Sequence, residues 1–247
     1  MTFSEDSVWI FMAILPIVAF MYAAVGHGGA SGYLALMALF SFSPEIMKPT
    51  GLLLNLFVAG ISFYHFWKGG HYNYKLFISF AVGSIPLSYI GGLIEVDTSI
   101  YKVILGILLI FAILKMLNVF GKEVEKTKPI QLPLAIIIGA CIGFFSGLIG
   151  IGGGIILSPV ILLLNWGKVK EAAAVSALFI WVNSLSGILG QWATGIEFDQ
   201  NIWIFVLLAV FGGYLGAYVG SKRMNNQSLR YLLVFVLILA SVKLILF

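Results

Sequence analysis

Long apolar runs alternate with short polar breaks along the whole chain. A run of about 20 apolar residues is long enough to cross the roughly 30 Å hydrocarbon core of a bilayer as a helix. The pattern predicts such spans over residues 50–67, 76–94, 103–120, 172–192, 202–220 and 229–246. We therefore expect an all-α polytopic membrane protein.

Two further apolar runs, 8–42 and 132–164, differ from these spans because each holds a glycine cluster near its middle. As one helix, residues 8–42 would measure roughly 50 Å, which is too long for a single crossing. Each glycine also costs a helix about 1 kcal/mol relative to alanine. We therefore predict that each run is a hairpin of two helices that turns at its glycines.

The same order of elements occurs twice. A glycine-bearing run followed by three spans makes a first repeat over residues 1–120 and a second over 132–247, with a polar linker at 121–131 between them. Gly26-His-Gly-Gly in the first repeat corresponds to Gly150-Ile-Gly-Gly in the second. Asn55 and Asn183 fall in equivalent spans, about one position out of register. This self-similarity indicates an internal repeat.

The charges of the loops predict how the two repeats are oriented. Basic residues cluster in the linker and in the loop 221–230, whereas the loop 193–201 carries only acidic charges. The residues concerned are Lys122, Lys126, Lys128, Lys222, Arg223, Arg230, Glu197 and Asp199. The positive-inside rule places the basic loops in the cytoplasm and the acidic loop outside. This requires each glycine run to enter and leave on one side, so we predict inverted repeats with both termini external. If each run crossed once, the basic loop would lie outside.

Composition supports a membrane protein and narrows its partners. Of the 247 residues, 61% are hydrophobic and only 10% are charged, too few to cover a soluble surface of this size. The lipid bilayer is therefore the expected surrounding. The net charge is +4, and lysines lie at the ends of spans, where they set the orientation of the protein in the membrane. This charge therefore does not indicate a nucleic-acid partner. The single cysteine, Cys141, excludes an internal disulfide.

Paired broken helices in inverted repeats are typical of secondary transporters, whose sites lie near the midplane of the bilayer. The second helix of each predicted hairpin begins at the glycine turn, so its unpaired N–H groups and partial positive charge favour a small anion. We predict an anionic substrate bound by Gly26, His27, Gly28, Gly29, Ser31, Asn55, Gly150, Gly152, Gly153, Gly154 and Asn183. Ser31 could cap the first of these helices or donate to the ligand.

Other interpretations of the same residues stay open. Glycines also permit close helix packing, which is the interpretation we favour for Gly91, Gly92, Gly212, Gly213, Gly216 and Gly220. His27 could hold charge near an anion, carry a proton, or be a neutral group hydrogen-bonded inside the bundle. Asn55 and Asn183 could join helices by hydrogen bonds instead of lining a site.

Several functions are disfavoured by what the sequence lacks. No acidic residue lies deep in a span, although proton or sodium coupling usually uses one. An exported anion needs none, because the interior-negative potential drives it outward by about 2.3 kcal/mol per charge per 100 mV. Without catalytic motifs, we expect no enzyme and no cofactor. Three histidines without acidic partners make a metal site unexpected, but a permease for another small anion or a metal cation stays an alternative. We also consider a homodimer.

The second glycine cluster resembles a known family. Gly147-Leu-Ile-Gly-Ile-Gly-Gly-Gly154, followed by Leu157-Ser-Pro and by Glu171-Ala-Ala-Ala-Val-Ser-Ala177, is similar to the TauE/SafE family of sulfite exporters. The resemblance covers nearly the whole chain. It implies a bacterial-type inner-membrane transporter, expected to be an exporter, of sulfite, sulfoacetate or related organosulfur anions. The first copy departs from the pattern, with His27 beside its first glycine and Ala30-Ser31 at the positions of Gly154-Ile155.

Overall fold

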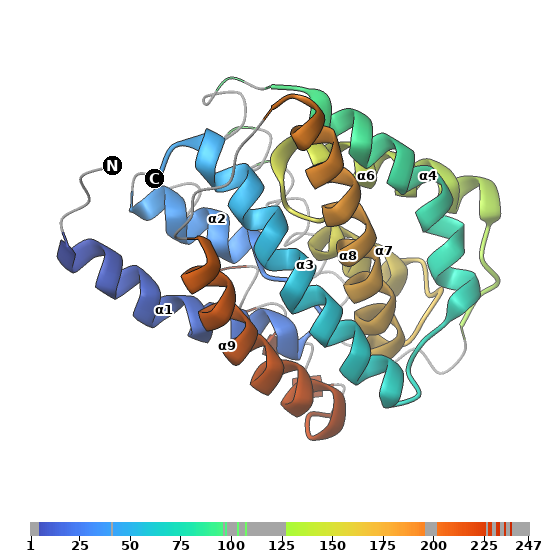
Figure 1. Ribbon diagram of the computed structural model, residues 1–247. Helices are drawn as coiled ribbons and strands as arrows, with labels where there is room; N and C mark the ends of the chain where they lie inside the picture. The colour runs from blue at the N-terminus through green and yellow to red at the C-terminus, as the bar shows by residue number, and fades with distance from the viewer. Residues whose placement is uncertain are drawn as a thin grey trace.

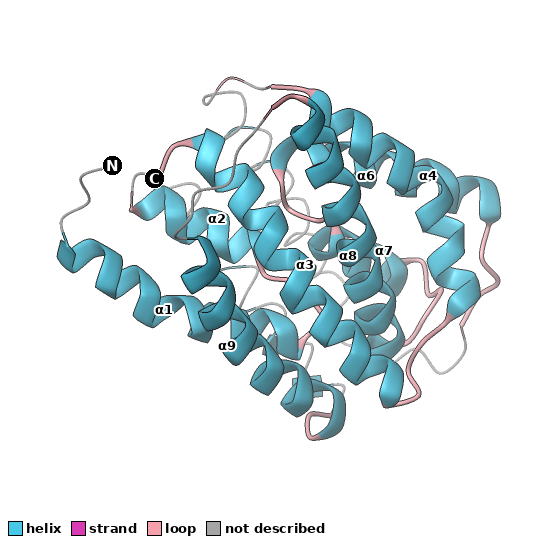
Figure 2. Cartoon of the chain, in the orientation of Figure 1, coloured by secondary structure: helices cyan, strands magenta, loops and turns pink. Residues whose placement is uncertain are grey.

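The computed structural model describes residues 5–40, 42–95, 97, 103, 107, 127–195, 202–225, 227–228, 231–232, 235 and 238. All regular structure within these residues is helical, as Figure 2 shows, which confirms the predicted all-α class. Apart from the single positions just given, the predicted spans 103–120 and 229–246 lie outside the described residues, as does most of the linker 121–131. The same is true of the loop residues Lys122, Lys126, Glu197, Asp199 and Arg230.

The helices follow the predicted order. They are α1 (Glu5–Ala24), α2 (Ala30–Leu39), α3 (Pro44–Lys68), α4 (Tyr74–Leu93), α6 (Leu132–Ile149), α7 (Gly154–Leu163), α8 (Val169–Ala193) and α9 (Ile202–Lys222). Among the described residues, five helices are long and apolar enough to cross a membrane, namely α3 from Glu45 onward, α4, α6, α8 and α9. Helix α3 begins at Pro44 rather than at residue 50, because proline fits the first turn of a helix, where its missing N–H is not needed.

Both glycine-bearing runs break where the sequence predicts. Helix α1 ends before Gly26 and α2 begins after Gly29, while α6 and α7 are separated by residues 150–153. Gly150 closes α6 with φ 87° and Gly153 precedes α7 with φ 76°, both in the left-handed region that L side chains avoid. The glycines therefore allow the chain to leave one helix and start another within a few residues.

Each glycine-bearing run begins and ends at one end of the helix bundle. In the first run, the ring of Phe11 lies 5.9 Å from that of Phe40 and 5.3 Å from that of Phe42, measured between centroids. In the second run, the backbone N–H of Lys128, just before α6, donates to the carbonyl of Asn165, just after α7, at 2.7 Å. The two turns therefore lie inside the bundle, away from the open ends of the hairpins.

The two hairpins open at opposite ends of α9. Phe11 of the first hairpin contacts Phe205 near the start of α9, with ring centroids 4.9 Å apart. Beyond the second hairpin, Lys170 at the start of α8 donates through Nζ to the carbonyl of Ser221 at the end of α9, at 3.1 Å. The glycine turns therefore approach the middle of the bundle from opposite directions.

Helices α3 and α8 contact each other in the centre of the bundle, with α1 and α9 packed together on one side and α4 and α6 on the other (Figure 1). Both outer pairs are joined by glycines at a spacing of four residues, where a Cβ would overlap a carbonyl of the neighbouring helix. These glycines are Gly139, Gly143 and Gly147 of α6, against α4, and Gly212, Gly216 and Gly220 of α9, against α1. The packing role predicted for Gly212, Gly216 and Gly220 is therefore confirmed.

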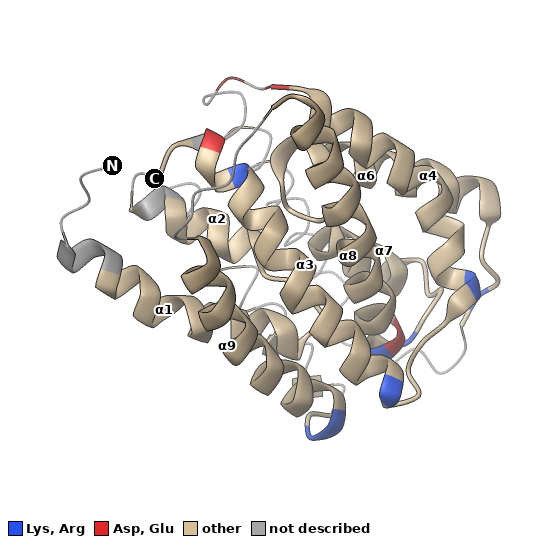
Figure 3. Cartoon of the chain, in the orientation of Figure 1, with Lys and Arg blue, Asp and Glu red and all other residues tan. Residues whose placement is uncertain are grey.

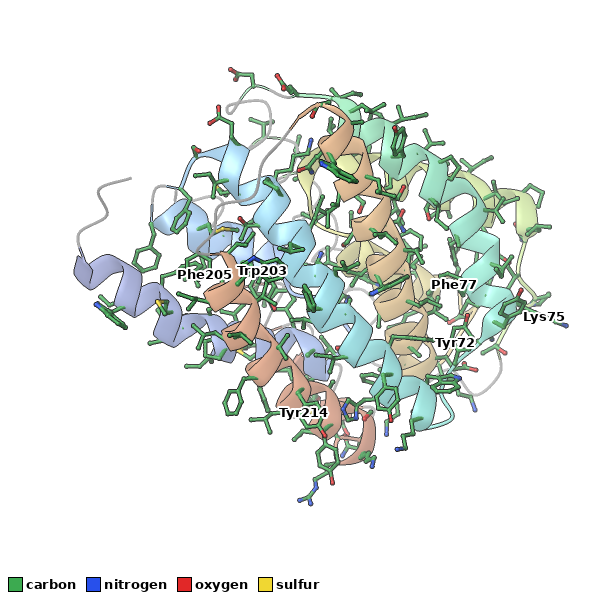
Figure 4. All side chains as sticks on the ribbon, viewed as in Figure 1. Tyr72, Lys75, Phe77, Trp203, Phe205 and Tyr214 are labelled. Atoms are coloured by element: carbon green, nitrogen blue, oxygen red, sulfur yellow. The ribbon has the colours of Figure 1, made fainter. Side chains whose placement is uncertain are left out.

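The outer surface suits a lipid environment. Figure 3 shows the charged residues of the described chain at the helix ends and in the connecting segments, and none of these residues lies in the middle of the bundle. Figure 4 shows side chains covering the outside of the helices, among them Trp203 and Tyr214 of α9, which are 56% and 52% exposed. Aromatic residues of this kind are common where a membrane protein meets lipid and its interface with water. The exposed surface thus agrees with the apolar spans.

Candidate functional site

Asn55 lies between the two helix breaks. It comes from the middle of α3 and is fully buried, and its Oδ1 accepts a hydrogen bond from the N–H of Ala30, the first residue of α2, at 2.9 Å. A side chain at Gly28 would overlap this Oδ1, and a Cβ at Gly152 would lie 2.5 Å from Nδ2 of the same amide. One amide group therefore borders both breaks, and glycine at each break leaves it room.

His27 joins the two breaks directly. Its Nε2 lies 2.9 Å from the carbonyl oxygen of Gly154, the first residue of α7, and both residues are buried. A carbonyl oxygen only accepts, so Nε2 carries the hydrogen and Nδ1 of the neutral ring is left as an acceptor. Nδ1 has no hydrogen-bond partner among the described residues.

Two polar side chains lie close beside Gly152, where only glycine fits. A Cβ there would lie 2.5 Å from Asn55 Nδ2, 3.2 Å from Ser184 Oγ and 2.7 Å from the Cγ2 methyl of Ile180. Asn55 and Ser184 are both fully buried. Within the described part of the chain, neither Asn55 Nδ2 nor Ser184 Oγ has a hydrogen-bond partner. Buried polar groups are usually paired, so two unpaired donors at one point suggest a place for a ligand.

The helices that start at the breaks add backbone donors. In α7, the N–H groups of Ile156 and Leu157 both reach the carbonyl of Gly153, so those of Gly154 and Ile155 remain without an acceptor among the described residues. In α2, the N–H of Ala30 is capped by Asn55. Helix N-termini also carry partial positive charge, so both breaks present donors and a favourable field to an anion.

Two predicted site residues have side chains directed elsewhere. Ser31 is the second residue of α2, and its hydroxyl donates to the hydroxyl of Tyr22 at 3.0 Å, while the capping role considered for Ser31 is taken by Asn55. Asn183 donates through Nδ2 to Ser84 Oγ on α4 at 3.1 Å and to the carbonyl of Phe179 at 2.8 Å. The amide of Asn183 therefore ties α8 to α4.

The predicted glycines differ in which residues a side chain at their position would contact. A side chain at Gly26 would meet the backbone of Ala173 in α8, and one at Gly150 would meet Lys48 in α3. A side chain at Gly154 would meet Ile180, which also borders Gly28 and Gly152. A side chain at Gly29 would meet the ring of Tyr33, and one at Gly153 would meet Ile142 and the ring of Phe179. Gly28 and Gly152 are thus the glycines that face Asn55.

The predicted site did not include Lys48, and Ser184 was only a weaker candidate beside Ser176, Ser186 and Gln191 of the same span. Nothing in the local sequence separates Ser184 from the other serines of its span. Lys48 does carry a signal, because it precedes the span 50–67 on the side where the positive-inside rule predicts few bases. Its stem lies against Gly150, and its Nζ donates to the carbonyls of Ile94 at 3.1 Å and Gly92 at 3.5 Å.

The centre of the bundle is uncharged. The buried polar residues of the described chain are His, Ser, Thr, Asn and Gln, with no Asp, Glu, Lys or Arg among them. In the same residues, no group of three or more His, Cys, Asp or Glu lies close enough to hold a metal ion. Any ion that enters the site must therefore be held by hydrogen bonds and helix termini.

Comparison with known proteins gives the family. The profile of the family described as sulfite exporter TauE/SafE matches residues 11–244. The probable membrane transporter protein y4hK of Sinorhizobium fredii is 36% identical over 235 residues, covering 93% of this chain and 94% of that protein. The probable membrane transporter protein YunE of Bacillus subtilis is 28% identical over 227 residues, covering 82% and 81%. No solved structure matches the chain.

These matches extend over nearly the whole chain, so they concern the complete arrangement of helices and not one motif. They agree with the apolar spans and with the uncharged polar centre between two broken helices. The chain is a multi-pass membrane transporter and belongs to the TauE/SafE sulfite exporter family.

Proposed function

We propose that this transporter moves small sulfur-containing anions, such as sulfite or organosulfonates, outward across the cell (inner) membrane without changing them chemically. The observation that carries the proposal is the position of Asn55. It caps α2 at one break, and its free Nδ2 faces Gly152 at the other, beside unpaired N–H groups of α7. Tetrahedral and pyramidal oxyanions present several acceptor oxygens, which suits donors that converge from two sides.

The charge of the site supports an anion and an outward direction. All of the groups placed at the breaks are hydrogen-bond donors or uncharged side chains, and no carboxylate is buried among the described residues to hold a cation. A coupling ion is not required for export, because the interior-negative potential contributes about 2.3 kcal/mol per negative charge per 100 mV. Voltage alone would then drive the anion out of the cell.

The inverted orientation of the two repeats is part of this proposal. It is supported by the two hairpins opening at opposite ends of α9 and by the basic residues Lys68, Lys170 and Lys222 gathering near the end of the bundle where the second hairpin opens. Under the positive-inside rule that end is cytoplasmic, and both termini are then external.

Alternating access follows from how the breaks are held. The hydrogen bond from His27 to the Gly154 carbonyl joins the two breaks. Opening toward one side would separate the breaks and release this bond. The bound anion would be exposed first to one side of the membrane and then to the other.

Flux measurements in proteoliposomes test the proposal. Purified protein is reconstituted with radiolabelled sulfite inside, and a potassium diffusion potential is imposed in either direction. We expect sulfite efflux that rises when the interior is negative, and competition by other small sulfonates. Protein-dependent flux that is absent, or that ignores the potential, would contradict the proposed activity.

Gly152→Ala and Gly70→Ala make a matched pair for the site itself. Both glycines have left-handed backbones, with φ 73° and 75°, so both variants carry a similar backbone strain of roughly 1–2 kcal/mol. The methyl group at position 152 would lie 2.5 Å from Asn55 Nδ2 and 2.7 Å from the Cγ2 methyl of Ile180, so these groups must shift, whereas no heavy atom lies within 4 Å of the Cβ position at Gly70. We expect about a tenfold or larger loss of flux in Gly152→Ala alone. Equal flux in the two variants would contradict a substrate site beside Gly152.

A further inference from the structure

Polar side chains continue from the breaks toward the end of the bundle where the first hairpin opens. In α3, Lys48 precedes Asn55 by seven residues, and in α8, Gln191 follows Ser184 by seven. Seven residues are almost two turns of a helix, so the members of each pair share one face and lie roughly 10 Å apart. Each helix therefore carries one polar residue beside the breaks and a second one nearer that end.

Lys48 and Gln191 reach the same end of the bundle, because α3 and α8 both contact Gly92 of α4 there. The Nζ of Lys48 donates to the carbonyl of Gly92 at 3.5 Å and to that of Ile94 at 3.1 Å. A Cβ at Gly92 would lie 3.2 Å from Cα of Gly190, the residue before Gln191. The beginning of α3 and the end of α8 thus meet at the end of α4.

The amide of Gln191 is buried without a partner. This residue is 2% exposed, and within the described chain neither its Oε1 nor its Nε2 has a hydrogen-bond partner. It follows Ile180 by about three helical turns and Ser184 by about two, so it lies on the face of α8 that borders Gly152. Buried amides are usually paired, so this one indicates that a polar ligand passes along that face.

The two breaks have matching neighbours that differ in charge. The turn of the first break packs against Ala173 of α8, and the turn of the second packs against Lys48 of α3. Seven residues after each of them comes a residue that borders both breaks, Ile180 in α8 and Asn55 in α3. Ala173 and Lys48 therefore occupy equivalent places, but only the second break has a positive charge beside it.

The charge of Lys48 is unusual for its position. The other basic residues of the described chain lie toward the opposite end of the bundle, as Figure 3 shows, and the positive-inside rule predicts few bases at this end. Its ammonium stabilises the carbonyl end of α4, as a neutral donor would also do. Lys48 is half-buried, whereas the nearby acids Glu45 and Glu95 are exposed. Its charge is thus the one held closest to the breaks.

We propose that Lys48 and Gln191 form an external anion-binding site, which the transported anion occupies between Asn55 and the solution outside the cell. Lys48 supplies the charge and Gln191 an amide donor. The carbonyls of Gly92 and Ile94 hold the ammonium until the anion replaces them as its partner. This inference rests on the proposed function and orientation, because it names where the same anions bind on their way out.

Uptake of radiolabelled sulfite into bacterial membrane vesicles of both orientations tests the external site. Right-side-out vesicles expose the external face of the protein to the bath, and inside-out vesicles expose its cytoplasmic face. A potential that is positive inside the vesicle drives the anion inward in both. Lys48→Gln keeps a donor for the carbonyls of α4 but removes the charge. We expect it to raise the external KM about tenfold, as for one lost hydrogen bond to a charged group, and to change the cytoplasmic KM less than about twofold.

Two control variants separate the charge from other effects. Lys48→Arg keeps the charge, so its external KM should stay close to that of the wild type. Lys75→Gln removes an exposed charge at the start of α4, on the outside of the bundle in Figure 4, and should change neither KM. An unchanged external KM in Lys48→Gln, equal rises on both faces, or an equal rise in Lys48→Arg would each overturn the inference.

Gln191→Leu tests the second residue independently. Leucine has a similar size and removes an amide that has no partner in the described chain, so thermal stability should be unchanged or raised. We expect the external KM alone to rise severalfold, and an unchanged external KM would contradict the proposed external site. Wild-type vesicles separate the two proposals. If they show no protein-dependent sulfite uptake, the proposed function fails and this inference with it; if uptake is normal but neither variant has a one-sided effect, only the external site fails.

Discussion

Replacing Asn55 by alanine should impair transport more than it impairs folding. The side chain has two separable roles, since Oδ1 caps the N–H of Ala30 at 2.9 Å while Nδ2 lies beside Gly152 without a partner in the described chain. Alanine removes both groups. The capping role affects the stability of the first break, and the free donor affects only the bound anion.

The size of each effect can be worked from these contacts. Ala30 is 2% exposed, so water does not replace the lost acceptor, and an unsatisfied buried N–H costs about 1–3 kcal/mol. We therefore expect Asn55→Ala to lower the free energy of unfolding by about 2 kcal/mol. A hydrogen bond to a charged group contributes about 1.5–3 kcal/mol, which corresponds to roughly a tenfold to hundredfold loss of kcat/KM.

Asn73→Ala is the control for the capping role. Asn73 precedes α4, and its Oδ1 accepts from the N–H of Leu76 at 3.1 Å, which is the same kind of bond at a half-buried position outside the site. Its loss should cost about 1 kcal/mol, typical of a helix N-cap. Heating curves of both purified variants, followed by sulfite flux per folded protein, measure the two effects separately.

The comparison between these two variants can refute the reasoning. If both lower the flux per folded protein to the same extent, Asn55 acts on transport only through the stability of its helix. If Asn55→Ala is destabilised but transports at the normal rate, Nδ2 does not contact the anion. Only a selective loss of flux in Asn55→Ala agrees with a binding role.

Two further predictions concern packing and orientation. Gly216→Val should lower the free energy of unfolding by about 3 kcal/mol, because even a Cβ would overlap a backbone carbonyl of α1. Leu207→Val, at a 70% exposed position, should have little effect. Size-exclusion profiles after mild heating distinguish the two variants, and equal profiles would contradict the close contact. In a Cys141→Ser background, Lys222→Cys should react with a membrane-impermeant thiol reagent only from the cytoplasm and Glu95→Cys only from outside; labelling of both from one side would refute the inverted orientation.

Within the described residues, the sequence by itself determined the helices and the position of their breaks. The length of an apolar run and the backbone freedom of glycine are local properties, so the runs 8–42 and 132–164 could be divided before any contact was known. The uncharged centre was also predictable, because no acidic residue lies within the spans. These features depend on neighbours in the chain and on the lipid, and not on which helix packs against which.

The tertiary structure alone decided which side chains meet at the breaks. The bond between His27 and Gly154 joins residues 127 positions apart, and Asn55 caps a helix that begins 25 residues earlier. No local pattern encodes such pairs. They also decide that Ser31 contacts Tyr22 and leaves the capping of α2 to Asn55.

Asn55 and Asn183 illustrate the physical reason. They seemed nearly equivalent along the sequence, about one position out of register, but one residue of offset turns a side chain by roughly 100° around a helix. Asn55 borders the two breaks, while the amide of Asn183 bonds to Ser84 and to its own helix. Sequence spacing predicts which residues share a helix, but the rotation of that helix against its neighbours, fixed by packing across the whole bundle, determines which of them face the site.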